Sequence, residues 1–348
     1  MLLLDPKAAR VTWTVFVFAL AIALLYLLRD VILLFILSLF FAYLIWPLVT
    51  LVQRLLLGGR RRTVAIVVVY VVLVLALVGI GAAVGPRLSD EVTALTQKIP
   101  AMSQQLQSGE FLGNLLGRYG WGSELIGQID HTVRSHAQEF IGYAQHALTG
   151  ALKWLAGAWV VILIPIFAFF LLKDGDRALE HTNDLIESRR QREVWRGIAE
   201  DVHRLLAEYV RALVVLAIIT FVVWSGVFLT AGVPYAFVLA AVGGALEFIP
   251  LVGPLSAGVI VVSVALFSGY PHPWLLLGFV LLWRGIQDYV SSPLVMGRGI
   301  EIHPALVIFG VIAGGEVAGP AGMFLSVPVI AALRIVWRRL RSTPPSSP

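Results

Sequence analysis

The sequence predicts an all-α fold, a polytopic bundle of about eight transmembrane helical segments. Apolar residues make up 59% of the 348 residues and charged residues only 14%, against about 25% charged in soluble domains. The mean hydropathy is +0.87. The apolar runs are continuous over about 20 residues, as a spanning helix requires, and do not alternate with polar residues as membrane β-strands do.

Three predicted helices occupy the N-terminal region, residues 1–85. The apolar runs cover residues 11–28, 31–52 and 63–85. Lys7 and Arg10 precede the first run as in a signal peptide, but the run ends at Arg29 with no small-residue cleavage site, and a second run follows at once. The first helix is therefore predicted to be a retained anchor.

Two polar segments flank the fourth predicted span, residues 151–172. Residues 86–150 carry six acidic and four basic side chains with apolar residues at helical spacing, which predicts an extracytoplasmic insertion of amphipathic helices. Residues 173–208 alternate basic and acidic side chains, which is typical of a solvated helical segment, here assigned to the cytoplasmic side. Both segments are interpreted first as connecting structure.

The C-terminal membrane core, residues 209–338, is apolar but interrupted by prolines. Four spans are predicted in it, at residues 212–231, 235–269, 274–290 and 305–337. The second and fourth of these are long and contain Gly and Pro in their middle, so broken or re-entrant helices are predicted near residues 247–254 and 314–322. Residues 339–348, rich in Ser and Pro, are predicted to be a disordered tail.

The distribution of basic residues predicts how the chain is oriented. With the N-terminus in the cytoplasm, the cytoplasmic segments hold 18 of the 26 Lys and Arg residues. This asymmetry follows the positive-inside rule and favours eight crossings with both termini cytoplasmic. The net charge of +5 therefore marks a cytoplasmic rim, and membrane lipid rather than nucleic acid is the expected partner.

The sequence lacks the motifs of several functional classes. It contains no Cys, which excludes disulfides, thiolate metal sites and a cysteine nucleophile. It has no Gly-rich phosphate loop ending in Lys and Ser or Thr, no His-Glu-x-x-His and no Gly-x-Ser-x-Gly. No enzyme activity, resident cofactor or metal is therefore expected, and no site for nucleotide hydrolysis is present.

Four ionisable residues lie inside the predicted spans, and each is a candidate site residue. A charged side chain at the middle of a bilayer costs about 2.5 to 3.5 kcal/mol, so intramembrane charges are rare and usually functional. The four residues are Glu247, Arg284, Asp288 and Glu316.

Glu247 lies beside the first predicted break. Residues that would shape a cavity surround it in the sequence: Gly243, Gly244, Pro250, Gly253 and Pro254. Proline removes a backbone donor and glycine permits an unwound bend, and a helix broken at bilayer depth can hold an ion or a polar solute. The alternative is that Glu247 only caps a helix end near the interface.

Glu316 occupies a similar setting, after Gly314 and Gly315 and before Gly319 and Pro320. Both stretches run from an apolar half-span through Gly-Gly, a Glu and Gly-Pro to a second half-span. The Glu precedes Gly-Pro by six residues in the first stretch and by three in the second. An internal repeat of broken helices is therefore a hypothesis for these two stretches.

Arg284 and Asp288 are four residues apart, so they are predicted to pair on one face of a helix. The pair either takes part in gating or solute binding, or only neutralises its own charge. A further break follows, in which Pro293 and Gly297 are the cavity-shaping candidates.

Four stretches of the chain resemble the autoinducer-2 exporter family of bacterial membrane proteins. In family order they are Phe169-Phe-Leu-Leu-Lys-Asp-Gly175, Phe248-Ile-Pro-Leu-Val-Gly-Pro254, Gln287-Asp-Tyr-Val-Ser-Ser-Pro293-Leu-Val-Met-Gly297, and His303-Pro304 with residues 322–328. The combination is specific, whereas each piece alone is not. Glu316 departs from the family pattern, in which an apolar residue is usual at this place.

The resemblance implies a transporter in the bacterial inner membrane that forms a homo-oligomer, with a pentamer as one such assembly. It implies export of a small polar organic solute of the autoinducer-2 type, and some members are similar to monovalent cation/proton antiporters, which is the first alternative. Because no nucleotide site is present, coupling to an H⁺ or Na⁺ gradient is expected, with Glu247 and Asp288 as coupling carboxylates. The second alternative is a non-transporting membrane scaffold that acts through residues 86–150.

Overall fold

The structure is a computed structural model, and every regular element in the part of the chain that it describes is a helix. The described residues are 6–57, 62–108, 124, 127, 158–184, 186, 188–291 and 303–341. The predicted all-α fold is confirmed. Pro293, Gly297 and the predicted tail beyond residue 341 lie outside the described residues.

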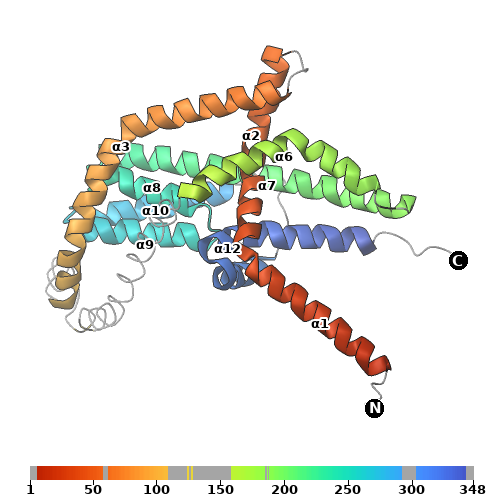
Figure 1. The fold of residues 1–348 in the computed structure, drawn as a ribbon. Coiled ribbons are helices and arrows are strands. Elements are labelled where there is room, and N and C mark those ends of the chain that lie inside the picture. The colour runs from red at the N-terminus through yellow and green to blue at the C-terminus, as the bar shows by residue number, and fades with distance from the viewer. Residues whose placement is uncertain are drawn as a thin grey trace. The chain divides into compact units, whose positions relative to one another are not determined.

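The chain divides into two compact units, and Figure 1 labels the helices along it. In chain order they are α1 (Pro6–Leu27), α2 (Arg29–Leu57), α3 (Arg62–Ser108), α6 (Ala158–Asp184), α7 (Arg189–Thr230), α8 (Ala236–Leu246), α9 (Val252–Phe267), α10 (Pro273–Ile286), a π-helical turn η1 (Gln287–Ser291) and α12 (Pro304–Arg341). Within the described ranges, five helices are long and apolar enough to cross a membrane, namely α1, α2, α3, α7 and α12.

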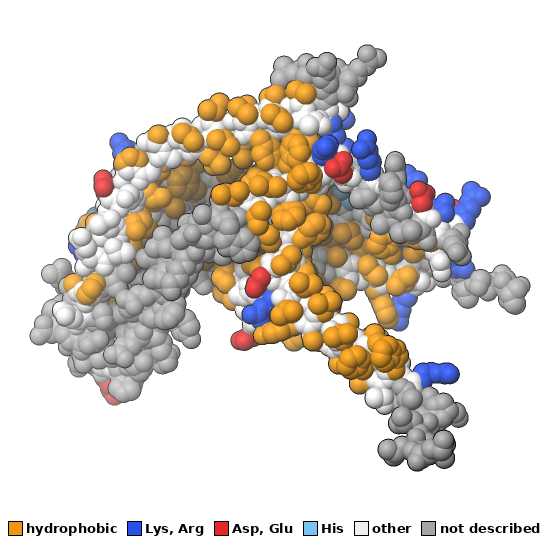
Figure 2. Space-filling model, in the orientation of Figure 1, with side chains coloured by type: hydrophobic (Ala, Val, Ile, Leu, Met, Phe, Trp, Pro, Cys, Tyr) orange, Lys and Arg blue, Asp and Glu red, His pale blue; other side chains and the backbone are white. Residues whose placement is uncertain are grey.

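The first unit comprises Met1–Ile66 and Ala158–Thr182, and so contains α1, α2 and most of α6. Along α1 the large apolar side chains are exposed, for example Trp13 at 66% and Phe18 at 67%. Figure 2 shows the same apolar cover over α1, with charged side chains gathered near its ends. A helix that is apolar on all sides and exposes those side chains is suited to lipid and not to water.

The second unit comprises Val67–Gly157 and Asn183–Pro348, and it contains the residues of the candidate site. Its core is an apolar cluster formed by the C-terminal part of α7 together with α8, α9 and α10. The buried face of α7 is set by residues three or four positions apart, the spacing that places side chains on one side of a helix. These residues are Leu213, Leu216, Thr220, Trp224 and Phe228.

The helices α8 and α9 form a hairpin, called here hairpin A. The chain turns over Glu247–Leu251, where Leu251 adopts a positive φ of 65°. At the open end, the Tyr270 hydroxyl donates to the Ala231 carbonyl (3.2 Å), so the chain has returned to the end of α7 from which it set out. At the closed end, a Cβ on Gly253 would overlap the Leu246 carbonyl oxygen, so only glycine lets the two arms meet this closely.

The helix α12 is a second hairpin, called here hairpin B. Its helical geometry fails at Ala318 and Gly319, where the φ of Gly319 is +58°. On the two sides of this kink, Gly314 lies against the backbone of Gly322, and Gly310 lies against Ser326 and Ile330. Residues later in the first arm therefore contact residues earlier in the second arm, which is the register of an antiparallel helix pair.

The predicted breaks near 247–254 and 314–322 are therefore confirmed as the tips of two hairpins. The sequence predicts residues 235–269 and 305–337 each as one crossing with a broken or re-entrant helix, whereas in the structure each segment folds back on itself. The physical reason is that Gly253 and Gly322 permit backbone-to-backbone contact between the arms, which favours a reversal over a simple kink. The structure also continues α3 without interruption through Pro86 to Ser108, beyond the end predicted for the third span.

Candidate functional site

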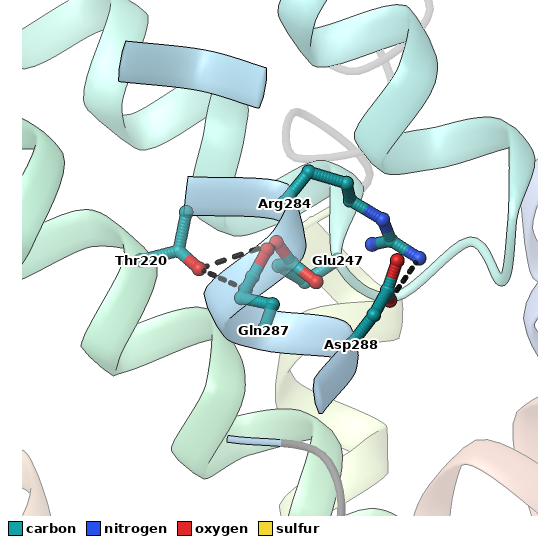
Figure 3. Close-up of polar contacts among 5 residues, drawn as sticks. All are labelled: Thr220, Glu247, Arg284, Gln287 and Asp288. Carbon is teal, nitrogen blue, oxygen red and sulfur yellow. Dashed lines mark hydrogen bonds and ion pairs between the residues drawn. The ribbon is translucent and has the colours of Figure 1, made fainter. Parts of the chain in front are cut away.

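A buried group of three polar side chains lies among α7, hairpin A and α10 (Figure 3). Thr220, Glu247 and Gln287 are exposed by 0%, 7% and 3%, and we call them the polar cluster. The Thr220 hydroxyl donates to Oε1 of Glu247 (3.2 Å). The Gln287 amide Nε2 donates both to Thr220 Oγ1 (2.7 Å) and to the same Glu247 oxygen (2.9 Å).

Each member of the cluster is positioned by a different element. Thr220 lies on the buried face of α7. Glu247 is the C-cap of α8, so it begins the turn of hairpin A. Gln287 opens the π-helical turn η1, at the point where the regular α10 ends. Single π-turns in helices are frequent at functional sites.

The hydrogen bonds of the cluster converge on one of the two oxygens of Glu247. The hydroxyl hydrogen of Thr220 and both amide hydrogens of Gln287 have acceptors within the cluster, and Glu247 Oε1 accepts two of these bonds. Oε2 takes no part in these three bonds. A proton, or a cation ligated by oxygen, can therefore be received at Oε2 while the network at Oε1 is kept.

The cluster lies deep in the apolar part of the second unit. Thr220 precedes the end of α7 by ten residues, which is about 15 Å along a helix. Glu247 follows the 11 residues of α8, or about 16 Å. Since the hydrocarbon core of a bilayer is about 30 Å thick, these lengths are those expected for a site near its middle.

Arg284 and Asp288 form the ion pair expected from their spacing. The Arg284 Nη2 to Asp288 Oδ1 distance is 2.7 Å, and the two side chains are 32% and 45% exposed. Figure 3 shows the pair beside the polar cluster, with Asp288 directed to Arg284 and not to Glu247. The structure thus joins Glu247 to two neutral partners, and leaves the Asp288 carboxylate with a cation of its own.

Glu316 is placed apart from the polar cluster by its position in hairpin B. It lies in the last turn of the first arm, and its side chain is exposed. Hairpin B nevertheless reaches hairpin A, because the rings of Phe248 and Phe324 lie 5.9 Å apart in an edge-on arrangement. The Tyr209 hydroxyl of α7 also donates to the Phe324 carbonyl (3.1 Å).

The glycines and prolines singled out in the sequence have distinct structural roles. A Cβ on Gly243 would lie 2.5 Å from the Trp224 ring, and one on Gly244 would lie 2.8 Å from the Ala217 carbonyl oxygen. Both glycines therefore bring α8 close to α7. Pro250 lies in the turn of hairpin A, and Pro254 lies in the first turn of α9, where the missing N–H is tolerated.

Two members of the polar cluster are not identified by reasoning from the sequence alone. Gln287 stands inside an apolar span and Thr220 on a buried helical face, but both are uncharged and escape a search for ionisable residues. Their neighbours one turn away, Trp224 and Trp283, are buried, and their indole N–H groups have no acceptor among the described residues. Gln287 directly precedes Asp288 in the sequence, but nothing in the sequence connects it or Thr220 with Glu247, from which they are 40 and 27 residues away.

These observations define a class: a multi-pass helical membrane protein with two hairpins that meet beside a buried carboxylate. In the described residues no group of three His, Cys, Asp or Glu side chains could hold a metal ion. Comparison with known families gives the family. Residues 15–342 match the AI-2E family transporter, and the chain belongs to that family.

Relatives cover most of the chain. The YrrI protein of Bacillus subtilis (strain 168) is 28% identical over 305 residues, which are 86% of this chain and 84% of that protein. The AI-2 transport protein TqsA of Escherichia coli (strain K12) is 26% identical over 310 residues, 88% of this chain and 85% of that protein. The permease class is thus established by the family, whereas the substrate of any one relative is a property of that relative.

Proposed function

We propose that the protein is a secondary transporter that exports a small polar organic solute in exchange for protons or sodium ions, with Glu247 as the coupling residue. The observation that carries this proposal is the burial of the Glu247 carboxylate within a network of neutral donors. A carboxylate at this depth is costly when charged. Binding of a proton or Na⁺ removes the charge, so ion occupancy and movement of the site through the membrane are linked.

The coupling step is a change in what occupies Glu247 Oε2. When the carboxylate is bare, its charge is held by the donors of Thr220 and Gln287 and disfavours exposure to lipid. When a proton binds at Oε2, the network at Oε1 persists and the site becomes neutral. The neutral site can pass between the two aqueous sides, which is the requirement for alternating access.

The arrangement of the two hairpins supports alternating access to one site. Hairpin A opens beside the end of α7, whereas the last turns of α12 lie beside the beginning of α7, where Arg339 pairs with Asp201 at 2.8 Å. The hairpins thus enter from opposite ends of α7 and meet at Phe248 and Phe324. With both termini in the cytoplasm of a bacterial inner membrane, hairpin A would enter from the outside and hairpin B from the inside.

The solute is proposed by analogy with one relative. TqsA is named an AI-2 transport protein, and a small polyhydroxylated solute of that kind could accept hydrogen bonds from the indole N–H groups of Trp224 and Trp283. We place Arg284 and Asp288 as polar groups at the edge of the pathway, and Asp288 as the second coupling carboxylate. Glu316 at the tip of hairpin B is a candidate for the inner mouth. We also propose a homo-oligomer, with a pentamer as one form.

Flux measurements in proteoliposomes test the proposal. The probe is autoinducer-2, and the protein is reconstituted in the inside-out orientation, so that export from a cell corresponds to uptake into the vesicle. Uptake by the wild-type protein should rise with an imposed pH or Na⁺ gradient. Glu247→Gln, which keeps an acceptor oxygen and a similar volume but cannot be charged, should lose the dependence on the gradient. Gradient-dependent flux that is unchanged in both Glu247→Gln and Asp288→Asn would contradict the proposal.

A second candidate is a monovalent cation/proton antiporter. The specific observation in its favour is that the polar cluster brings a carboxylate oxygen and a hydroxyl oxygen together, and hard cations prefer oxygen ligands of this kind. Proton efflux from vesicles driven by Na⁺ or K⁺ alone, with no organic solute present, would favour this function.

A further inference from the structure

The beginning of α8 lacks a local helix cap. Tyr235 occupies the N-cap position in a left-handed conformation, with φ 59° and ψ 39°, and its side chain makes no capping hydrogen bond. No acidic residue lies in the first turn of α8. The first N–H groups of any helix need acceptors from outside the helix, and in a membrane-embedded element water is poorly placed to supply them.

Glu91 of α3 supplies the missing acceptor. Its Oε2 accepts a hydrogen bond from the backbone N–H of Val238 at 2.9 Å, across 147 residues of sequence. Val238 is the third residue of α8 and is buried, at 6% exposure. The carboxylate therefore acts as the N-cap of a helix to which it is not adjacent, and its charge faces the positive end of the helix dipole.

Lys98 makes a second contact from the same helix. Its ammonium lies 5.9 Å from the centre of the Tyr235 ring, within the range of a cation–π interaction. Lys98 follows Glu91 by seven residues, or two helical turns, so the two side chains project from one face of α3. The extension of α3 beyond residue 86 thus contacts the beginning of α8 at two places.

Strained backbone lies just before α8 and at the end of the turn that follows it. Among the described residues, Tyr235 and Leu251 are the only ones other than glycine with a positive φ, and they flank α8 and the turn that follows it. Such conformations persist when the surrounding contacts hold them. A short helix between two strained residues is suited to move as one body, and it carries Glu247 at its far end.

We propose that Glu91 and Lys98 form a latch that holds the beginning of α8 against α3. While the latch is in place, hairpin A closes the polar cluster off from the outer side of the membrane. This inference rests on the proposed function, because it assigns the latch to one step of alternating access. Release of the Val238 N–H from Glu91 would free the beginning of α8 to tilt, and α8 would carry Glu247 with it. Glu91 is in this sense a positioning residue for the transport site.

Thiol labelling tests the latch without a known solute. The chain has no Cys, so Ser225→Cys provides a single reporter that is buried on α7, at 8% exposure, and is not part of the polar cluster. In right-side-out vesicles, a charged methanethiosulfonate reagent added outside should label this reporter slowly when Glu91 is present. Combined with Glu91→Leu, the labelling rate should rise roughly two- to thirtyfold, the range that corresponds to loss of one helix cap.

A graded series separates capping from packing. Glu91→Gln keeps an acceptor oxygen but loses the charge, so its labelling rate should fall between those of Glu91 and Glu91→Leu. Lys98→Met should raise the rate by a smaller factor. Asp90→Leu, the exposed neighbour on α3, is the matched control and should leave the rate unchanged.

The latch would be overturned if the labelling rate were the same with Glu91 in place, with Glu91→Gln and with Glu91→Leu. It would also be overturned if none of the three proteins were labelled. If Glu91 acted only by packing, Glu91→Leu would leave the labelling rate unchanged, because leucine fills a similar volume. Should Glu91→Leu fail to yield folded protein by size-exclusion chromatography, Glu91→Gln and Lys98→Met decide the question. The flux assay on Glu247→Gln is independent of Glu91, so the latch and the proposed function can fail separately.

Discussion

At the scale of single residues, one carboxylate distinguishes the interior of this protein. Glu247 is 7% exposed, and its hydrogen-bond partners within the polar cluster are the neutral side chains of Thr220 and Gln287. Neutral donors stabilise a bare carboxylate less than a paired cation would, and they leave it able to exchange a proton or cation. Arg284, one turn before Gln287 on the chain, is ion-paired with Asp288.

The donors of the cluster can be removed one at a time. Thr220→Val removes the hydroxyl with little change of volume, and Gln287→Leu removes both amide bonds. Each variant removes one hydrogen-bond donor from the bare carboxylate of Glu247, which destabilises its charged form and favours binding of a proton. We therefore expect both variants to require a lower external proton concentration for half-maximal flux. The shift should be larger for Gln287→Leu, since Gln287 also orients Thr220. Flux measured against pH in proteoliposomes checks this, and Tyr289→Phe, exposed at 86%, is the control that should not shift.

The charged members of the site are predictable from sequence and the neutral ones are not. Glu247 and the Arg284–Asp288 pair stand out because charge is rare in an apolar span. Thr220 and Gln287 become significant only when three separate elements bring them together, which a single sequence does not reveal. Glu316 has the same local pattern as Glu247, yet its exposed position at the tip of hairpin B gives it a different environment.

At the scale of elements, the two hairpins depend on close backbone contact. Gly244 lies under the Ala217 carbonyl of α7, and Gly253 and Gly322 allow the arms of hairpins A and B to meet. Such contacts are typical of packing between membrane helices, where small residues let the backbones approach. Two of the prolines predicted to shape a cavity, Pro250 and Pro254, lie in the turn of hairpin A and at the start of its returning arm.

Substitution by alanine tests whether a glycine is needed for close backbone contact. Gly244→Ala should destabilise the protein by about 1 to 3 kcal/mol, because the added Cβ meets a backbone oxygen that cannot move aside. Gly226→Ala, on α7 with open space around the added Cβ, is the matched control and should be neutral or stabilising, since alanine favours a helix. Thermal unfolding in detergent measures both, and equal melting temperatures for the two variants would contradict the packing argument.

The link between α7 and hairpin B can be tested through Tyr209. Tyr209→Phe removes the hydroxyl that donates to the Phe324 carbonyl and keeps the ring contact between these residues. The expected loss is about 0.5 to 1.5 kcal/mol, the net value of a typical hydrogen bond. A melting temperature equal to that of wild type would show that this bond does not hold hairpin B to α7.

At the scale of the whole molecule, the class of fold follows from composition, while the course of the chain does not. A chain with 14% charged residues and continuous apolar runs is a helical membrane protein whatever its details. Whether an interrupted span crosses or turns back depends on contacts between its halves. Hydropathy is the same in both cases, and so the reversals at Gly253 and Gly322 become evident only from the structure.

Opposite entry of the two hairpins predicts a pattern of accessibility. His272, between α9 and α10, and Arg341, at the end of α12, are both exposed. In the cysteine-free chain, His272→Cys should react with an impermeant thiol reagent added outside the cell, and Arg341→Cys only after the membrane is opened. Reaction of both from the same side would contradict the proposed topology.

Glu247 is proposed to couple ion movement to solute movement, and counting the ions moved with each solute tests this most directly. Wild-type protein in proteoliposomes, given a solute gradient and no pH or Na⁺ gradient, should move either protons or Na⁺ in a fixed ratio to solute. Glu247→Gln should move solute without that ion. An unchanged ratio of ion to solute in Glu247→Gln would contradict the proposed coupling.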